Sequence, residues 1–401
     1  MSSVVTQPTN SSLTSWIDLS GSWREVLWGF VILTLPFNLY QPGSPQPSDF
    51  LLVAVLCVPI LVVRFKMPPA IAGPVFALAA FVLYVGACNF AWSAITGEYD
   101  FFKSSLFYAF NFAVFVGYLV MLGERGDDWM RWTLYGFAAT LVMLALLSIP
   151  FADRNESGRL QLFFFNANQL AYHVLLCATG VVMIAPRYRV PRLVIYVLLV
   201  CAFYLEFRTY SRAGILGIAL LAGLQLVHRP TLLTVVALPL LGLALYLDLQ
   251  NLDPDLLQNR LQTVERSTTE DYLRDRGLDR IFEHPEYLFV GAGEGHMLRF
   301  HHHKQEIHSS AANLLFSYGI AGGLLFLVFV RKLTVSVGSR LTLLMVPALS
   351  YSLFHHGMRA RPFWLLLAIA LGLAVLNEIE AEKKRTKPKL TLADGESVSR
   401  A

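Results

Sequence analysis

The sequence predicts an all-α membrane protein with about 12 transmembrane helices and one large periplasmic loop between helices 9 and 10. Two observations predict this fold class. Hydrophobic residues make up 55% of the 401 residues and charged residues only 15%, whereas about a quarter of a soluble domain is charged. The mean hydropathy of +0.52 comes from apolar runs of roughly 20 residues, the length at which a helix spans a bilayer.

Apolar runs bounded by charged residues, Pro or Gly define the predicted spans and divide the chain into five regions. The spans lie near 25–41, 49–65, 70–93, 102–122, 130–150, 162–185, 191–207, 211–228, 231–249, 309–330, 340–357 and 362–378. The regions are a polar N-terminus (1–24), helices 1–9 (25–249), the loop domain (250–308), helices 10–12 (309–378) and a basic tail (379–401). We expect the N-terminus to be retained, because it has neither a basic start nor a small-residue cleavage site.

The positions of the basic residues predict the orientation. Arg and Lys gather in every second connection, as in Arg187 to Arg192, and in the tail from Lys383 to Lys389. The positive-inside rule therefore places both termini in the cytoplasm and the loop 250–308 outside, in the periplasm. This loop holds eleven acidic and seven basic residues, a net charge of −4. Its segments 255–265 and 272–282 have apolar residues at helical spacing and are predicted to be amphipathic helices on the bilayer surface.

The composition also argues against several classes of site. The net charge of +4 is distributed between apolar runs, so it does not indicate a nucleic-acid partner. All four cysteines lie in hydrophobic stretches, where an isolated cysteine packs as a small apolar side chain. A metal site is not expected, because neither cysteines nor well-spaced carboxylates accompany the clustered histidines of the loop. No cofactor is expected either, and the chain has no Walker loop, dinucleotide fingerprint or Ser nucleophile elbow.

Histidines provide the sharpest chemical signal. Six of the ten lie between His284 and His308, and three of these, His301 to His303, are typical of a solvated turn. His308 differs because it stands where the loop enters the apolar helix predicted from Ser309. A neutral imidazole there can accept a proton from a hydroxyl. The alternative is that Ser309 and Ser310 cap the helix while His308 only orders the loop.

Arginines at the edges of apolar spans are the second signal, because a charge there is costly without a partner. Arg212 follows Tyr210 in a turn between two spans, where a guanidinium can hold a phosphate in bidentate fashion. Arg208 is expected to extend to lipid headgroups instead. Arg159 precedes Asn166 and Asn168, two amides at a helix entrance, which require neighbouring helices or a polar ligand as partners.

Four blocks of the sequence contain these residues: RLQLFFFNANQLA (159–171), SRAGILG (211–217), HPEYLFVGAGEG (284–295) and HSSAANLLFSYGIAGGLLFL (308–327). Together they resemble the recurring blocks of the O-antigen ligase and O-antigen polymerase superfamily. Their order and spacing, and the large loop after the ninth span, resemble that superfamily over roughly residues 20–380. The chain departs from the pattern at Ala167, where Pro is common, and at Ser309, where Asn is frequent.

The resemblance implies a metal-independent, inverting glycosyltransferase in the bacterial inner membrane. Its donor would be an undecaprenyl-diphosphate-linked saccharide and its acceptor lipid A core or a lipid-linked glycan. His308 would be catalytic, as a base or as an orienting hydrogen-bond donor. The residues expected to bind the diphosphate are Arg212, Arg280, Arg276 and Arg159, and those expected to bind substrate are Asn166, Asn168, Tyr210, Glu306 and His356.

Three functions remain open at this point. A single dominant outer loop favours a ligase over a polymerase, because many polymerases carry a second large loop. A transporter is the rival from another class, since twelve spans are also common there. The crowding of polar residues in outer connections, together with a short connection between helices 6 and 7, favours an enzyme over a transporter.

Overall fold

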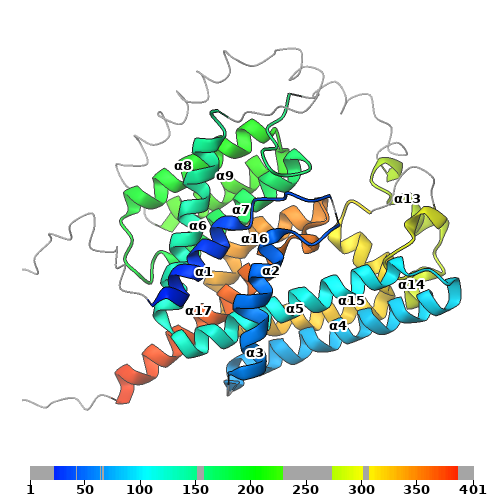
Figure 1. The fold of residues 1–401 in the computed structure, drawn as a ribbon, viewed down its shortest axis with the longest axis horizontal. Helices are drawn as coiled ribbons and strands as arrows, with labels where there is room; N and C mark the ends of the chain where they lie inside the picture. The colour runs from blue at the N-terminus through cyan, green and yellow to red at the C-terminus, as the bar shows by residue number, and fades with distance from the viewer. Residues whose placement is uncertain are drawn as a thin grey trace, which may run out of the picture.

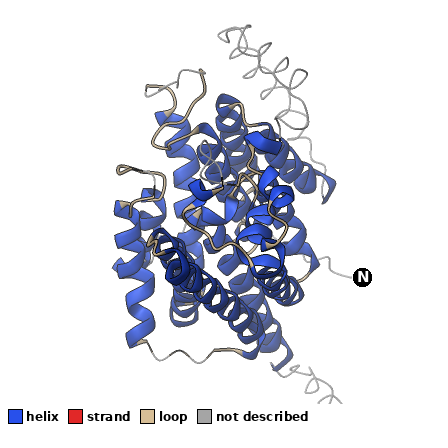
Figure 2. Cartoon of the chain, turned by 90° about the vertical axis from the view of Figure 1, so that its right-hand side faces the viewer, coloured by secondary structure: helices blue, strands red, loops and turns tan. Residues whose placement is uncertain are grey.

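The computed structural model describes residues 22–228 except 42, 64, 66 and 151–157, together with residues 273–300 and 307–386. Every regular element in these ranges is a helix, which confirms the all-α class (Figures 1 and 2). Six of the helices are long and apolar enough to cross a membrane. These helices indicate a multi-pass membrane protein. The predicted ninth span, 231–249, lies outside the described residues.

Three long helices lie side by side along one part of the molecule (Figure 1). They are α4 (Pro69–Thr96), α5 (Asp100–Arg125) and α15 (Ser310–Val337). Two short helices of the loop domain, α13 (Asp279–Glu283) and α14 (Tyr287–Val290), lie at one end of this group. The long helices thus form a base on which part of the loop domain rests.

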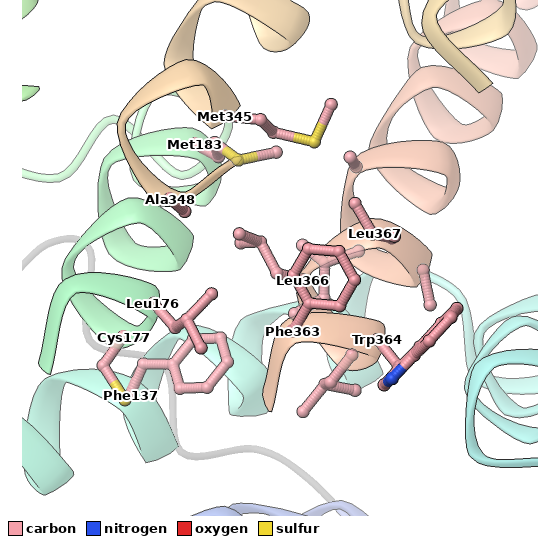
Figure 3. Packing of buried hydrophobic residues seen from close by; sticks show 14 of the residues in the cluster. Phe137, Leu176, Cys177, Met183, Met345, Ala348, Phe363, Trp364, Leu366 and Leu367 are labelled. Atoms are coloured by element: carbon pink, nitrogen blue, oxygen red, sulfur yellow. The ribbon is translucent and has the colours of Figure 1, made fainter. Parts of the chain in front are cut away.

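Six further helices pack beside this group. They are α6 (Asp127–Leu147), α7 (Ala167–Ile184), α8 (Arg192–Thr209), α9 (Arg212–His228), α16 (Ser339–Phe354) and α17 (Arg361–Thr386). α7 is buried along almost its whole length and packs against α6, α8, α16 and α17. Figure 3 shows Leu176 and Cys177 of this helix with Phe137 of α6, and Phe363 and Leu366 of α17 close by. α7 is therefore the central helix of the bundle.

The first two predicted spans are shorter or less regular than expected. The first helix, α1 (Trp23–Thr34), ends well before residue 41, where the predicted span ends. Pro36 explains this end, because proline has no backbone N–H to continue the helical hydrogen bonds. In the second span, α2 (Pro47–Leu52) and α3 (Val58–Val62) are joined by a π-helical turn at Val53–Cys57.

The loop segment 272–282 is not the continuous amphipathic helix that the sequence predicts. The backbone of Gly277 is left-handed (φ +63°), and the N–H groups of Gly277 and Leu278 bond back to the carbonyls of Arg274 and Leu273. This closes a helical turn, so α13 starts afresh at Asp279. The segment 255–265 lies outside the described residues.

α15 is broken near its first third, and the loop domain docks into the break. Gly319 has φ +64° and ψ −172° inside the helix. The carbonyls of Phe316 and Ser317, released from helical bonding, accept hydrogen bonds of 2.8 Å from the N–H groups of Ala292 and Gly293. Trp92 of α4 donates to the carbonyl of Gly291 (2.9 Å). A short loop segment is therefore held between two membrane helices.

The connections fall at two opposite ends of the helices. At one end, Arg187 pairs with Asp127 (Nη2 to Oδ2, 2.9 Å) and Asn377 (2.9 Å). Asp127 and Arg187 come from two connections, and Asn377 from the end of the last predicted span, that the sequence predicts to share one side of the membrane. The connections predicted to be outer meet at the other end, which we call the outer end.

Candidate functional site

Arg159 ties the connection before α7 to the end of α8. Its Nε donates to the carbonyl of Thr209 (2.8 Å) and its Nη2 to Oδ1 of Asn168 (2.7 Å). The next residue, Leu160, donates its N–H to the carbonyl of Arg208 (3.0 Å). The predicted arginine and amide are thus direct partners, and the arginine also completes the hydrogen bonding of a helix end.

Three helices begin at the outer end with side-chain caps. Asn166 accepts from the N–H of Gln169 (2.9 Å) at the start of α7. Ser211 accepts from Gly214 (3.3 Å) at the start of α9, and Ser309 from Ala312 (3.3 Å) at the start of α15. The N-terminus of a helix carries partial positive charge. Asn166 is therefore a cap, and Ser309 caps α15, whereas Ser310 bonds to the turn after α16.

Tyr351, in the last turn of α16, joins these helix starts. Its hydroxyl donates to the carbonyl of Asn168 (2.7 Å) and lies 3.4 Å from Oγ of Ser211. One face of its ring stacks on Tyr172 (centroids 4.6 Å apart), and the ring also contacts the imidazole of His355 (4.7 Å). Tyr351 thereby fixes the start of α7, the start of α9 and the turn after α16 relative to one another.

The turn after α16 is bonded to the start of α15. The carbonyl of His355 accepts from the N–H and Oγ of Ser310 (3.2 and 3.3 Å), and Oγ of Ser310 accepts from the N–H of Met358 (3.1 Å). Next to these, the N–H of His308 donates to the carbonyl of Arg276 (2.9 Å). The guanidinium of Arg276 bonds to the carbonyl of Phe354.

His355 lies among the cations that the sequence singled out. Burial, followed by the charge of Arg276, the nearby His308 and the charge of Arg159, lowers the pKa of His355 to about 4. Its imidazole is therefore neutral at physiological pH. We call Arg159, Arg276, His308 and His355 the imidazole–arginine cluster. His308 itself is exposed, and His355 is half-buried.

A second polar cluster surrounds Glu294, which sequence reasoning did not select. The side chain is 2% exposed, yet its carboxylate accepts from Arg359 (2.7 Å), Tyr318 (3.0 Å) and Tyr108 (3.2 Å). Nε2 of His356 lies 3.5 Å away. Although burial opposes ionisation, the charge of Arg359 and the contact with His356 hold the pKa of Glu294 well below its usual range. We call this set the Glu294 network.

The signal for Glu294 was present in the GAGEG turn. The backbone N–H of Glu294 donates a hydrogen bond to Oδ1 of Asn89 in α4 (2.8 Å). The backbone of Glu294 is therefore fixed as well as its side chain. Glu294 lies in a turn with three glycines, Gly291, Gly293 and Gly295, which let the backbone approach the membrane helices closely. A carboxylate in such a turn is a candidate for burial. Its partners could not be identified, because they lie on three other segments of the chain.

The remaining predicted residues occupy several environments. Arg212 is exposed at the start of α9, and Tyr210 ends α8 in a left-handed conformation (φ 51°). Arg280 is fully buried in α13, with its pKa lowered by burial, so its guanidinium does not face water. The side chain of His356 is 7% exposed and belongs to the Glu294 network. Glu306 lies outside the described residues.

This arrangement can bind an anion and position a hydroxyl beside it. Arg159 and Arg276, the exposed Arg212 and the starts of three helices supply positive charge, which suits a phosphate group. Two imidazoles stand next to this charge. In the described residues, no group of three His, Cys, Asp or Glu side chains is placed to hold a metal ion.

Comparison with known proteins finds no family model that matches the chain and no curated protein with a similar sequence.

Proposed function

We propose that this protein transfers a glycan from an undecaprenyl-diphosphate carrier to an acceptor hydroxyl on the periplasmic face of the bacterial inner membrane. The acceptor we favour is lipid A core, which makes the protein an O-antigen ligase. In this proposal both termini are cytoplasmic and the outer end faces the periplasm. The donor and acceptor classes rest on the resemblance of the four sequence blocks.

One observation supports the chemistry most strongly: the imidazole–arginine cluster is assembled from four connections that are far apart in the sequence. Arg159 precedes α7, Arg276 lies in the loop domain, His308 precedes α15 and His355 follows α16. Arginine guanidinium groups that gather at one place bind phosphate groups through paired, charge-assisted hydrogen bonds. A diphosphate supplies such phosphate groups at headgroup depth.

The proposed reaction uses these residues in separate roles. Arg212, Arg159 and Arg276 bind the diphosphate and stabilise the negative charge that grows on it as the sugar leaves. His308 contacts the acceptor hydroxyl as a base or as an orienting hydrogen-bond donor. The acceptor attacks the anomeric carbon from the face opposite the diphosphate, so the configuration inverts.

The test is glycan transfer by the purified protein in liposomes that contain a synthetic undecaprenyl-diphosphate oligosaccharide and lipid A core. We expect His308→Ala and Arg212→Ala to lower the rate by about 100-fold or more, with product measured by mass spectrometry. Arg208→Ala is the matched control, because Arg208 lies in the same turn but bonds to Tyr204 (2.8 Å). Full transfer by a stably inserted His308→Ala variant would contradict the mechanism.

A deletion strain separates the ligase from the alternative polymerase. Loss of a ligase leaves polymer on the undecaprenyl carrier and bare lipid A core. Loss of a polymerase leaves single repeats transferred to the core. A purified protein that moves sugars across vesicles but transfers none would instead indicate a transporter.

A further inference from the structure

His355 combines a fixed position with ring nitrogens that are not used in packing the protein. Its ring nitrogens form no hydrogen bond with a described residue. The residue is held by other means: its carbonyl accepts from Ser310 and Gly357, its N–H donates to Tyr351, and its ring contacts the ring of Tyr351. A fixed, half-buried imidazole with a ring nitrogen available can accept a proton from a bound hydroxyl.

We propose that His355 takes the proton of the attacking acceptor hydroxyl, while the exposed His308 beside it orients the acceptor. This proposal rests on the proposed function and assigns the base within that same site. Nothing in the pattern of the sequence blocks selects His355, because it lies beyond all four of them in the turn between α16 and α17.

The step balances as follows. The O–H bond of the acceptor breaks, and its electron pair forms the new bond to the anomeric carbon. The bond from the anomeric carbon to the phosphate oxygen breaks, and its electrons leave on the diphosphate. The proton moves to a ring nitrogen of His355 and is later released to the outer water, to which this half-buried side chain has access.

The surrounding charges couple this base to the donor. Among the described residues, the groups that face His355 are Arg276, His308, Arg159 and Tyr351, and two of them are permanent cations. Burial, and then these charges, lower the pKa of His355 in the free protein. A bound diphosphate neutralises those cations, so the pKa of His355 rises when the donor is in place. His355 thus becomes an effective base only beside a donor.

Variants separate a chemical role from a packing role. His355→Phe keeps an aromatic ring against Tyr351 and removes both nitrogens. We expect this variant to insert and melt like the wild type, to keep its KM for the donor and to lose about 100-fold or more in kcat. His284→Asn is the matched control, because His284 is another outer histidine, bonded to Glu286 (3.2 Å). Undiminished kcat in His355→Phe would overturn the proposal.

The pH profile supplies an independent readout. The kcat/KM profile reports the free enzyme and the kcat profile the donor complex. We expect kcat/KM to fall on acidification near pH 4, where His355 of the free protein becomes protonated. We expect kcat to fall already at a higher pH, because the pKa of His355 is raised in the donor complex. A fall of both at the same pH would overturn the coupling between His355 and the donor.

A binding measurement does not depend on turnover. In protein labelled with ¹³C at histidine Cε1, His355 is assigned as the signal missing from His355→Phe, and its titration is followed with and without undecaprenyl diphosphate. The expected result is a higher pKa with the lipid present, and an unchanged pKa would overturn the proposal. Absence of transfer by the wild type, with this shift observed, would instead contradict the proposed function.

Discussion

Gly214, in the first turn of α9, is required by a buried carboxyl. Both oxygens of Glu206 are buried without a hydrogen-bond partner in the described residues, and a Cβ at Gly214 would overlap with Oε2 of Glu206. We expect Gly214→Ala to lower the free energy of unfolding by about 2 kcal/mol, as measured by thermal and denaturant midpoints in detergent.

Two further variants test the cause. Gly223→Ala lies in the same helix with open space around its Cβ position and is expected to be neutral or slightly stabilising. Gly214→Ala combined with Glu206→Ala removes the overlap and is expected to recover most of the lost stability. A double variant no more stable than Gly214→Ala would show that the overlap is not the cause.

Several individual residues were predictable and others were not. A serine or asparagine before an apolar run is typical of a helix start, and Asn166, Ser211 and Ser309 all occupy that position. Glu294 was not predictable, because its partners Tyr108 and Arg359 are 186 and 65 residues away in the sequence. Local patterns report local partners, whereas the Glu294 network depends on how distant helices pack.

At the scale of elements, the break in α15 controls where the loop domain docks. Gly319 is left-handed, and a Cβ there would overlap with backbone atoms of Phe289 and Gly291. We expect Gly319→Ala to cost about 3 kcal/mol and to release the segment around Gly291, detected as faster limited proteolysis of the loop. Gly323→Ala in the same helix has open space and should leave proteolysis unchanged.

The Glu294 network is expected to stabilise the same loop segment in a pH-dependent way. Glu294→Gln removes the charge that Arg359 pairs with and is expected to destabilise the protein by about 1–3 kcal/mol. The stabilisation by the carboxylate is present above the ordinary pKa of a glutamate and is lost as the pH falls through the lower pKa of the folded state. The wild type should therefore lose stability relative to Glu294→Gln on acidification, in midpoints measured from pH 7 downward. Parallel profiles would contradict this account.

Elements were predicted more reliably in their existence than in their ends. Hydropathy indicates α4 and α5 because both are apolar over more than the length of a bilayer. It does not indicate that α1 stops at Thr34 or that Gly277 divides the helix predicted at 272–282. A single proline or glycine with special backbone geometry causes the end of α1 and the break at Gly277. Hydropathy averaged over a window of residues does not detect such single residues.

At the scale of the whole molecule, the two ends of the bundle are expected to face opposite compartments. Cysteines placed one at a time at Lys103 and Arg340, in a chain without its four native cysteines, test this orientation. We expect a membrane-impermeant maleimide to label Lys103→Cys in spheroplasts, and Arg340→Cys only after the membrane is opened. The reverse pattern would invert the topology.

The lengths of the helices around the site bear on the lipid that surrounds it. α7 and α8 have 18 residues and α16 has 16, whereas α4 has 28. At about 1.5 Å per residue, the shorter helices extend about 24–27 Å, less than the roughly 30 Å of hydrocarbon in a bilayer. A bilayer can meet such a mismatch by local thinning. The imidazole–arginine cluster would then stand in a shallow depression of the outer leaflet, where the carrier lipid that we propose would present its diphosphate without being drawn out of the headgroup layer.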